Sequence, residues 1–261
     1  MATTTTVDGV TIHYERAGQG PAVVLVHGIT DSGADWAPVD ERLAVDRTVL
    51  TLDLRGHGRS GDAVDCSPLA MANDVAAVVA DADVAPPLLV GHSLGGAVVS
   101  AYAAGAPCRG VVNIDQSLRF SDFGVALGQL EHQLKGSGFH AAMRAIFHSL
   151  DGPLMPDHLR VRLAANRDQA RQDIVLRIWE LIFTSTGEEL DTITDAIGPA
   201  ITVPYLSIHG SDPGDGYEAW LTERLPQAQV ERWADHGHYP HLVDPDRFVA
   251  RLAELERHIV S

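Results

Sequence analysis

Short, unbroken runs of apolar residues recur along the chain, and they constrain its fold more than any other feature. The clearest run is residues 22–26, and similar runs lie at 49–52, 87–90, 110–114 and 203–208. An unbroken β-branched run without polar alternation is typical of a strand that is buried on both faces of a parallel sheet. Helix-like stretches at 67–81 and 94–104 separate some of these runs. Strand and helix therefore alternate, which predicts a mostly parallel α/β sheet covered by helices.

The alternation is interrupted once, between residues 117 and 200. This stretch shows helix-like segments at 123–134, 139–150, 157–183 and 188–197, and no convincing strand. Strand character returns at Val203, so we interpret the stretch as an insertion into a single domain. The predicted core comprises residues 1–116 and 201–261, and the predicted helical lid comprises 117–200. Five of the six phenylalanines lie in this lid and would give it an apolar inner face: Phe120, Phe123, Phe139, Phe147 and Phe183.

The charge of the chain argues against several kinds of partner. Acidic residues number 35 against 19 basic ones, which gives a formal charge of −16. Such a surface repels phosphate backbones and anionic lipid, so we expect neither nucleic acid nor membrane partners. The only lysine is Lys135, so a Ser/Lys dyad or a Schiff base would depend on that residue alone. The preference for Arg is typical of a GC-rich bacterial genome.

The cysteines and the apolar runs bear on the location of the protein. Cys66 and Cys108 are too few for a disulfide framework. The N-terminal residues do not form a signal-like pattern, and no apolar run approaches the length of a membrane span. We therefore expect a cytoplasmic protein with reduced cysteines.

Residues 88–96 read Leu-Leu-Val-Gly-His-Ser-Leu-Gly-Gly and place Ser93 between a predicted strand and a predicted helix. A serine on so sharp a turn must adopt strained backbone angles, and the flanking Gly91 and Gly95 leave room for its neighbours. The turn also puts the backbone N–H of Leu94 at the start of a helix, where it can face an oxyanion. This pattern predicts Ser93 as a nucleophile.

Two further segments make the chain resemble the α/β-hydrolase fold family over most of its length. After the strand at 22–26, His27-Gly28-Ile29 is similar to the family loop whose residue after the glycine provides the second oxyanion N–H, here Ile29. Downstream, residues 237–245 resemble the loop that presents the catalytic histidine, here His238. The resemblance implies a mostly parallel, eight-stranded sheet flanked by helices, with an inserted α-helical lid, in a serine esterase-like branch.

The general base and its orienting acid must come from the histidines and aspartates. His236, His238 and His241 share one loop, but no acidic or cysteine partner recurs at ligand spacing, so we expect no metal and no other cofactor. His92 is expected to point away from the neighbouring Ser93. The acid should follow the strand at 203–208, and Asp212 is the first choice there. Two alternatives stay open, Asp215 in the same loop and Asp115 at the end of the strand at 110–114.

These residues together imply a serine hydrolase. The expected reaction is cleavage of an ester or lactone of a small to medium apolar substrate through an acyl-enzyme, with Ser93, Asp212 and His238 as the triad and the N–H groups of Ile29 and Leu94 as the oxyanion hole. A C–C bond hydrolase, a perhydrolase and a ligand-binding receptor with weak turnover remain alternatives. For the first of these, the candidate arginines for a substrate carboxylate are Arg119, Arg144 and Arg177. A homodimer is left open.

Overall fold

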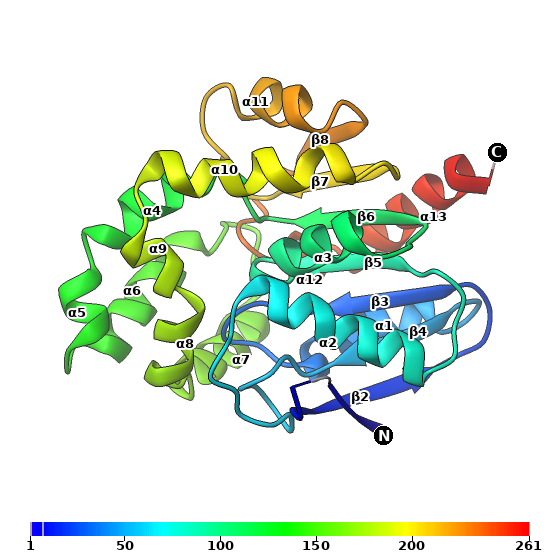
Figure 1. Cartoon of the computed structure of the whole chain (residues 1–261), viewed down its shortest axis with the longest axis horizontal. Helices are drawn as coiled ribbons and strands as arrows, with labels where there is room; N and C mark the ends of the chain where they lie inside the picture. The colour runs from blue at the N-terminus through cyan, green and yellow to red at the C-terminus, as the bar shows by residue number, and fades with distance from the viewer. Residues whose placement is uncertain (1, 7, 261) are drawn as a thin grey trace.

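Eight strands form one sheet in the computed structural model, which describes residues 2–6 and 8–260 (Figure 1). In chain order they are β1 (Ala2–Thr5), β2 (Thr11–Ala17), β3 (Ala22–Val26), β4 (Thr48–Leu52), β5 (Leu88–His92), β6 (Gly110–Ile114), β7 (Tyr205–His209) and β8 (Ala228–Arg232). Their order in space is β1-β2-β4-β3-β5-β6-β7-β8. The pairs β1–β2 and β2–β4 are antiparallel and all the others are parallel. The predicted fold class is confirmed.

The apolar runs of the sequence are the central strands, and each is buried along its whole length. In β3, Val23 and Leu25 belong to one hydrophobic cluster, whereas Val24 and Val26 belong to the other. Because side chains alternate between the faces of a sheet, a strand without polar residues requires a cover on both sides. The edge strand β8 is only partly buried and mixes polar with apolar residues. It contains no unbroken apolar run, so the sequence pattern did not predict it.

Helices provide the two covers. On one face lie α2 (Pro68–Asp81), α3 (Leu94–Gly105) and α11 (Tyr217–Arg224), and on the other lie α1 (Ala37–Leu43) and α13 (Pro245–Val260) (Figure 1). Two short helical turns, η1 (Gly33–Trp36) and α12 (Pro240–Val243), lie in loops that lead into α1 and α13. The predicted helices at 67–81 and 94–104 correspond to α2 and α3.

The residues between β6 and β7 are helical, as predicted, and we call residues 117–200 the helical insert. Its helices are α4 (Phe120–Gly128), α5 (Glu131–Lys135), α6 (Phe139–Leu150), α7 (Asp157–Asp168), α8 (Gln172–Ile178), α9 (Glu180–Thr184) and α10 (Gly187–Ile197), followed by η2 (Gly198–Ala200). The segment predicted as one helix at 157–183 is broken into α7, α8 and α9. Figure 1 shows the insert at one end of the sheet, beyond the carboxyl ends of the parallel strands.

A buried ion pair fixes the loop that follows β4. Arg55 binds Asp74 of α2 through two hydrogen bonds, of 2.7 Å from Nε and 2.6 Å from Nη2, and both side chains are almost completely buried. Arg55 also binds Asp8 near the N-terminus. In the described residues, the helices are too short or too polar to cross a membrane.

Candidate active site

The register of the parallel strands brings chemically useful residues to one edge of the sheet. His92, the last residue of β5, lies opposite Ile114 of β6, and Ile114 lies opposite Ile208 of β7. The residues that follow these strands therefore leave the sheet side by side at its carboxyl edge. Ser93 and Asp115 are two of them. In open α/β sheets this edge is where ligands bind.

Ser93 occupies the sharp turn that the sequence predicts. Its backbone angles are φ 51° and ψ −123°, a strained conformation for a residue with a side chain, and its N–H donates to the Ile114 carbonyl at 2.8 Å. The flanking glycines are required by space. A Cβ on Gly91 would lie 2.1 Å from the Gly95 carbonyl oxygen, and a Cβ on Gly95 would lie 2.2 Å from that of Val26.

His238 is held by a carboxylate at the same edge. Its Nδ1 lies 2.6 Å from Oδ2 of Asp115, and both side chains are buried. The other carboxylate oxygen of Asp115 accepts hydrogen bonds from the N–H groups of Gly210 at 2.9 Å and Ser211 at 3.0 Å. Burial alone would raise the pKa of Asp115, but the hydrogen bond and charge of His238, with the Ser211 N–H, lower it to about 2. Asp115 is therefore an ionised, fully satisfied acceptor.

The expectation that Asp212 would hold His238 is not met. Asp212 is 61% exposed and its Oδ2 lies 3.0 Å from Arg232, so its carboxylate is engaged on the surface. Asp215 is exposed as well. The loop after β7 instead turns its backbone N–H groups toward Asp115. Asp115 is the first residue after β6, and its φ is 53°. The structure thus brings His238 together with Asp115, the alternative acid at the end of the strand at 110–114.

The loop after β3 is organised by a histidine. Nε2 of His27 accepts the N–H of Leu54 at 3.0 Å, so its Nδ1 carries the proton and donates to the Gly28 carbonyl at 2.7 Å. Both ring nitrogens are thereby used within the loop. His27 is structural in this arrangement.

The backbone N–H groups of Ile29 and Leu94 are the candidates for an oxyanion hole. Ile29 and Leu94 are both buried, and neither amide N–H meets an acceptor among the residues that the structure describes. The peptide that carries the Ile29 N–H is fixed at its carbonyl end, because Nδ1 of His27 donates to the Gly28 carbonyl at 2.7 Å. A buried N–H without a partner is costly, and such groups are characteristic of sites that bind a developing negative charge.

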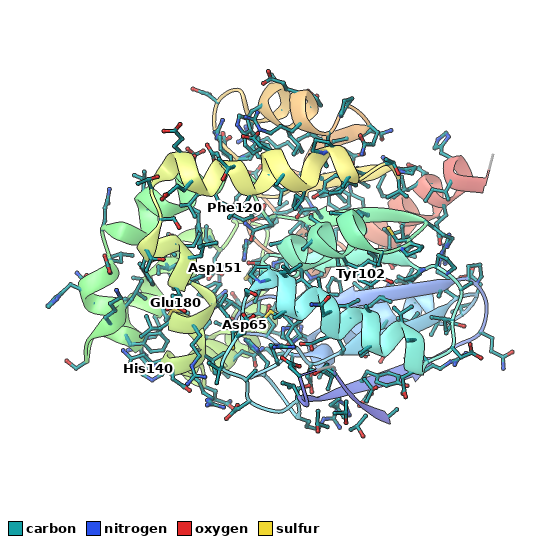
Figure 2. All side chains as sticks on the ribbon, viewed as in Figure 1. Asp65, Tyr102, Phe120, His140, Asp151 and Glu180 are labelled. Atoms are coloured by element: carbon teal, nitrogen blue, oxygen red, sulfur yellow. The ribbon has the colours of Figure 1, made fainter. Side chains whose placement is uncertain are left out.

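The helical insert contacts the loop that carries His238. The His238 N–H donates to the Leu150 carbonyl at 2.9 Å, and Asp151 forms a β-bridge with Gly237. Figure 2 shows Asp151 where the insert meets the sheet. The Asp151 carboxylate lies 3.0 Å from the guanidinium of Arg167 on α7, and both side chains are 4% exposed. The insert therefore holds the backbone of His238 in place.

Sequence reasoning missed Arg167, a buried cation that contacts this loop through Tyr239. Its guanidinium lies over the rings of Phe147, at 4.9 Å, and Tyr239, at 5.8 Å, and both rings also contact that of His238. Helix α7 is rich in polar residues, so its sequence suggests that its arginines are exposed to solvent. No local pattern marks Arg167 as the buried one. The candidates Arg119 and Arg144 are instead engaged with aspartates of the insert.

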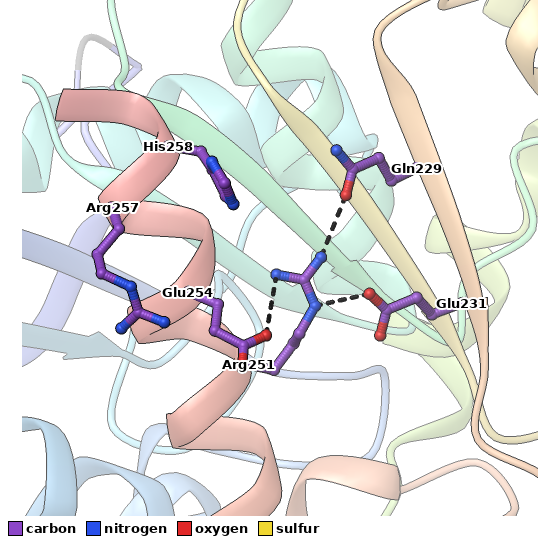
Figure 3. A pocket seen from close by; sticks show the side chains of 6 residues that line it. All are labelled: Gln229, Glu231, Arg251, Glu254, Arg257 and His258. Carbon is purple, nitrogen blue, oxygen red and sulfur yellow. Dashed lines mark hydrogen bonds and ion pairs between the residues drawn. The ribbon is translucent and has the colours of Figure 1, made fainter. Parts of the chain in front are cut away.

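A separate hollow of about 630 Å³ lies between β8 and α13 (Figure 3). Its lining is polar, and Arg251 is already bound there to Glu231, Gln229 and Glu254. This hollow contains neither the strained serine nor the histidine–carboxylate pair. Lys135 is engaged elsewhere, because it pairs with Glu131 on the insert and lies over the ring of Phe183. We therefore place the candidate active site at the carboxyl edge of β5 and β6.

A parallel sheet with a strained serine between strand and helix defines the class of α/β proteins that carry a nucleophile elbow. The sequence profile of the alpha/beta hydrolase family matches residues 23–251, and the chain belongs to that family. The predicted family is confirmed.

Individual relatives agree with this assignment. A stretch of 99 residues is 40% identical to an uncharacterised protein of Mycobacterium tuberculosis H37Rv, and it covers 38% of this chain and 29% of that protein. The chain is 28% identical over 259 residues to a pimeloyl-[acyl-carrier protein] methyl ester esterase of Chromobacterium violaceum, which covers 93% of this chain and 97% of that relative. It is 26% identical to the crystal structure of an esterase from Rhodococcus sp. ECU1013, with a TM-score of 0.74 and coverage of 100% and 98%.

Proposed function

We propose that this chain is a serine hydrolase that cleaves an ester or lactone of a small to medium apolar substrate. Ser93 is the nucleophile, His238 the general base and Asp115 the acid. The 2.6 Å hydrogen bond between His238 Nδ1 and Asp115 carries the proposal. Because this bond occupies Nδ1, it leaves Nε2 as the nitrogen that accepts the serine proton.

The acylation step follows from these roles. His238 Nε2 takes the proton of the Ser93 hydroxyl as Oγ forms a bond to the acyl carbon. The carbonyl oxygen becomes an oxyanion and accepts hydrogen bonds from the N–H groups of Ile29 and Leu94. The intermediate then collapses to the acyl-enzyme, and His238 gives its proton to the departing alkoxide. Asp115 stabilises the imidazolium throughout and stays ionised.

Deacylation repeats these steps with water. His238 removes a proton from the water molecule as its oxygen attacks the acyl carbon, and the same two N–H groups hold the second oxyanion. Collapse breaks the bond to Ser93 Oγ, which regains its proton from His238, and the carboxylic acid leaves. The enzyme returns to its starting protonation state.

The helical insert is proposed to be the lid over this site, with residues 1–116 and 201–261 as the core. Its apolar side chains support an apolar substrate. Phe147 contacts the ring of His238 at 6.1 Å, and Phe139 and Trp179 are buried in the cluster that also contains Leu94. An acyl chain near Ser93 would therefore meet aromatic and aliphatic surface.

Two observations favour an ester over a C–C bond as the target. The relative from Chromobacterium violaceum and the Rhodococcus structure are both named as esterases. In addition, each candidate arginine for a substrate carboxylate is engaged, Arg119 with Asp122, Arg144 with Asp168 and Arg177 with the Ala63 carbonyl.

Turnover of p-nitrophenyl acetate and butyrate by the wild type and Ser93→Ala tests the proposal. We expect the variant to fall to the background rate of ester hydrolysis while its thermal unfolding is unchanged. Ser149→Ala is the matched control, since Ser149 is an exposed serine of the insert. Full activity in Ser93→Ala would refute the mechanism. Faster turnover of a ring-fission dienoate than of either ester would assign the chain to C–C bond hydrolysis instead.

A further inference from the structure

His92 precedes the nucleophile and is buried against the loop of the catalytic base. Its ring centroid lies 4.6 Å from that of His238, 4.5 Å from that of Tyr239 and 4.7 Å from that of His241. Its Nε2 lies 2.8 Å from the backbone carbonyl oxygen of His238. His92 therefore points toward the loop that carries His238.

The proton on His92 can be placed from its partners. A carbonyl oxygen only accepts, so Nε2 must carry a hydrogen and donate it to His238. Nδ1 then faces Oδ2 of Asp31 at 3.5 Å, and both side chains are almost fully buried. A lone pair facing a carboxylate in a buried site is unfavourable, so this pair holds one further proton between its members.

The charge state of Asp31 agrees with this placement. Burial alone would raise the pKa of the Asp31 carboxyl, but the hydrogen bond and charge of His92 outweigh burial and hold the pKa below its usual value. Gly28 leaves the space that the pair occupies, since a Cβ there would lie 3.0 Å from both Asp31 Oδ2 and His92 Nδ1. Burial lowers the pKa of the His92 imidazole, and the Asp31 carboxylate is the main group that opposes this. The two residues thus form a compact, coupled pair behind the site.

We infer that Asp31 and His92 form a second histidine–aspartate pair, which touches no substrate and positions the catalytic base His238. The inference rests on the proposed function. Three chain segments meet in this pair. Asp31 lies two residues after Ile29 of the proposed oxyanion hole, His92 is the covalent neighbour of Ser93, and the carbonyl that His92 binds belongs to His238 itself.

Among the described residues, the hydrogen bond from His92 is one of two that hold the backbone of His238. The other runs from the His238 N–H to the Leu150 carbonyl in the helical insert. The preceding residue, Gly237, has a φ of 63° and no side chain that could pack and hold the loop. Without the His92 donor the imidazole would lose its fixed distance to Ser93, and a displacement of about 1 Å can reduce turnover about 10²-fold.

Two replacements of His92 separate positioning from packing. The amide nitrogen of Gln in His92→Gln reaches the position of Nε2 and can still donate to the His238 carbonyl. The shorter Asn in His92→Asn places its amide near Nδ1, where it meets Asp31 but not His238. Both are polar and smaller than or similar to His, so their thermal unfolding should be alike. His13→Gln is the control, because His13 forms another buried pair, with Asp53 at 3.3 Å.

The inference predicts that kcat on p-nitrophenyl butyrate falls about 10²-fold in His92→Asn, with KM within about twofold of the wild type. His92→Gln should restore kcat at least about tenfold above the Asn variant, and His13→Gln should keep the wild-type kcat. Equal kcat values for the Gln and Asn variants, or a wild-type kcat in the Asn variant, would overturn the inference.

Asp31 provides a second test that leaves His92 in place. The amide of Asp31→Asn can donate to Nδ1 and so keeps His92 in the form that binds His238, whereas Asp31→Ala cannot. We expect kcat to be at least about tenfold higher in the Asn variant, and equal values would contradict the pairing. Full activity in Ser93→Ala would overturn the proposed function and this inference with it. Inactivity of Ser93→Ala together with unaffected His92 variants would overturn the pair alone.

Discussion

Asp115 accepts hydrogen bonds from three donors, and this makes the effect of Asp115→Asn predictable. Oδ1 faces the N–H groups of Gly210 and Ser211, so the carbonyl oxygen of an Asn must occupy that side. Its NH₂ group then faces Nδ1 of His238, which must become an acceptor. The imidazole proton moves to Nε2, and His238 can no longer take the proton of Ser93.

The expected loss can be stated in numbers. The same change of carboxylate to amide in a serine protease triad lowers kcat about 10⁴-fold, because it selects the wrong tautomer. At about 1.4 kcal/mol per factor of ten, this corresponds to about 5 kcal/mol of transition-state stabilisation. Since the Asn preserves the shape of Asp115, we expect KM to change little.

Steady-state hydrolysis of p-nitrophenyl butyrate by Asp115→Asn and Asp212→Asn measures this effect. Asp212 is a matched control, because it lies in the neighbouring loop and is exposed in an ion pair with Arg232. We expect its variant to keep kcat within about twofold of the wild type. If Asp115→Asn retained more than about a tenth of wild-type kcat, or if Asp212→Asn lost about 10³-fold, the assignment of the acid would be refuted.

Three further outcomes concern stability. Because the folded pKa of Asp115 is lowered from 3.8 to about 2, its stabilisation is present above pH 3.8 and is lost as pH falls through 2; chemical denaturation from about pH 6 to pH 3 should cost the wild type about 1 kcal/mol more than Asp115→Asn. Gly152→Ala places a Cβ 2.4 Å from the backbone nitrogen of Gly237, in the loop that carries His238. It should lower the free energy of unfolding by about 1–3 kcal/mol and reduce kcat about 10²-fold. Gly105→Ala, which has open space around its Cβ, should change neither quantity. Arg55→Met leaves the carboxylate of Asp74 buried without its partner and should cost about 3–5 kcal/mol in denaturant titration, and a second change, Asp74→Leu, should recover most of that loss.

Much of the fold is predictable from the sequence because it depends on local pattern. A strand such as Ala22–Val26 needs no knowledge of its neighbours, since an unbroken apolar run has no solvent-compatible face. Ser93 is predictable for a similar reason, because its two glycines and the strand and helix around it are adjacent in the chain. The edge strand β8 is not predictable in this way, because no apolar run marks it. The breaks between α7, α8 and α9 are not predictable either, because no Gly or Pro lies between residues 157 and 186.

The residues that complete the site depend on contacts between distant segments. The proposed acid depends on which way the loop after β7 turns, because that loop directs its N–H groups, and not the carboxylate of Asp212, toward Asp115. His92 reaches the backbone of His238 across 146 residues of sequence, so its neighbours in the chain give no sign of that contact. Arg167 is similar, since only the folded insert places it over the rings around His238.

The central claim is that Ser93 is a nucleophile activated by His238 and Asp115. Labelling by a fluorophosphonate, followed by intact-mass and peptide mass spectrometry, tests it most directly, because the probe reacts with an activated serine and needs no knowledge of the substrate. We predict a single adduct on Ser93 in the wild type, no adduct in Ser93→Ala, and markedly slower labelling in Asp115→Asn. A folded wild type that gave no adduct, or an adduct that persisted in Ser93→Ala, would contradict the account.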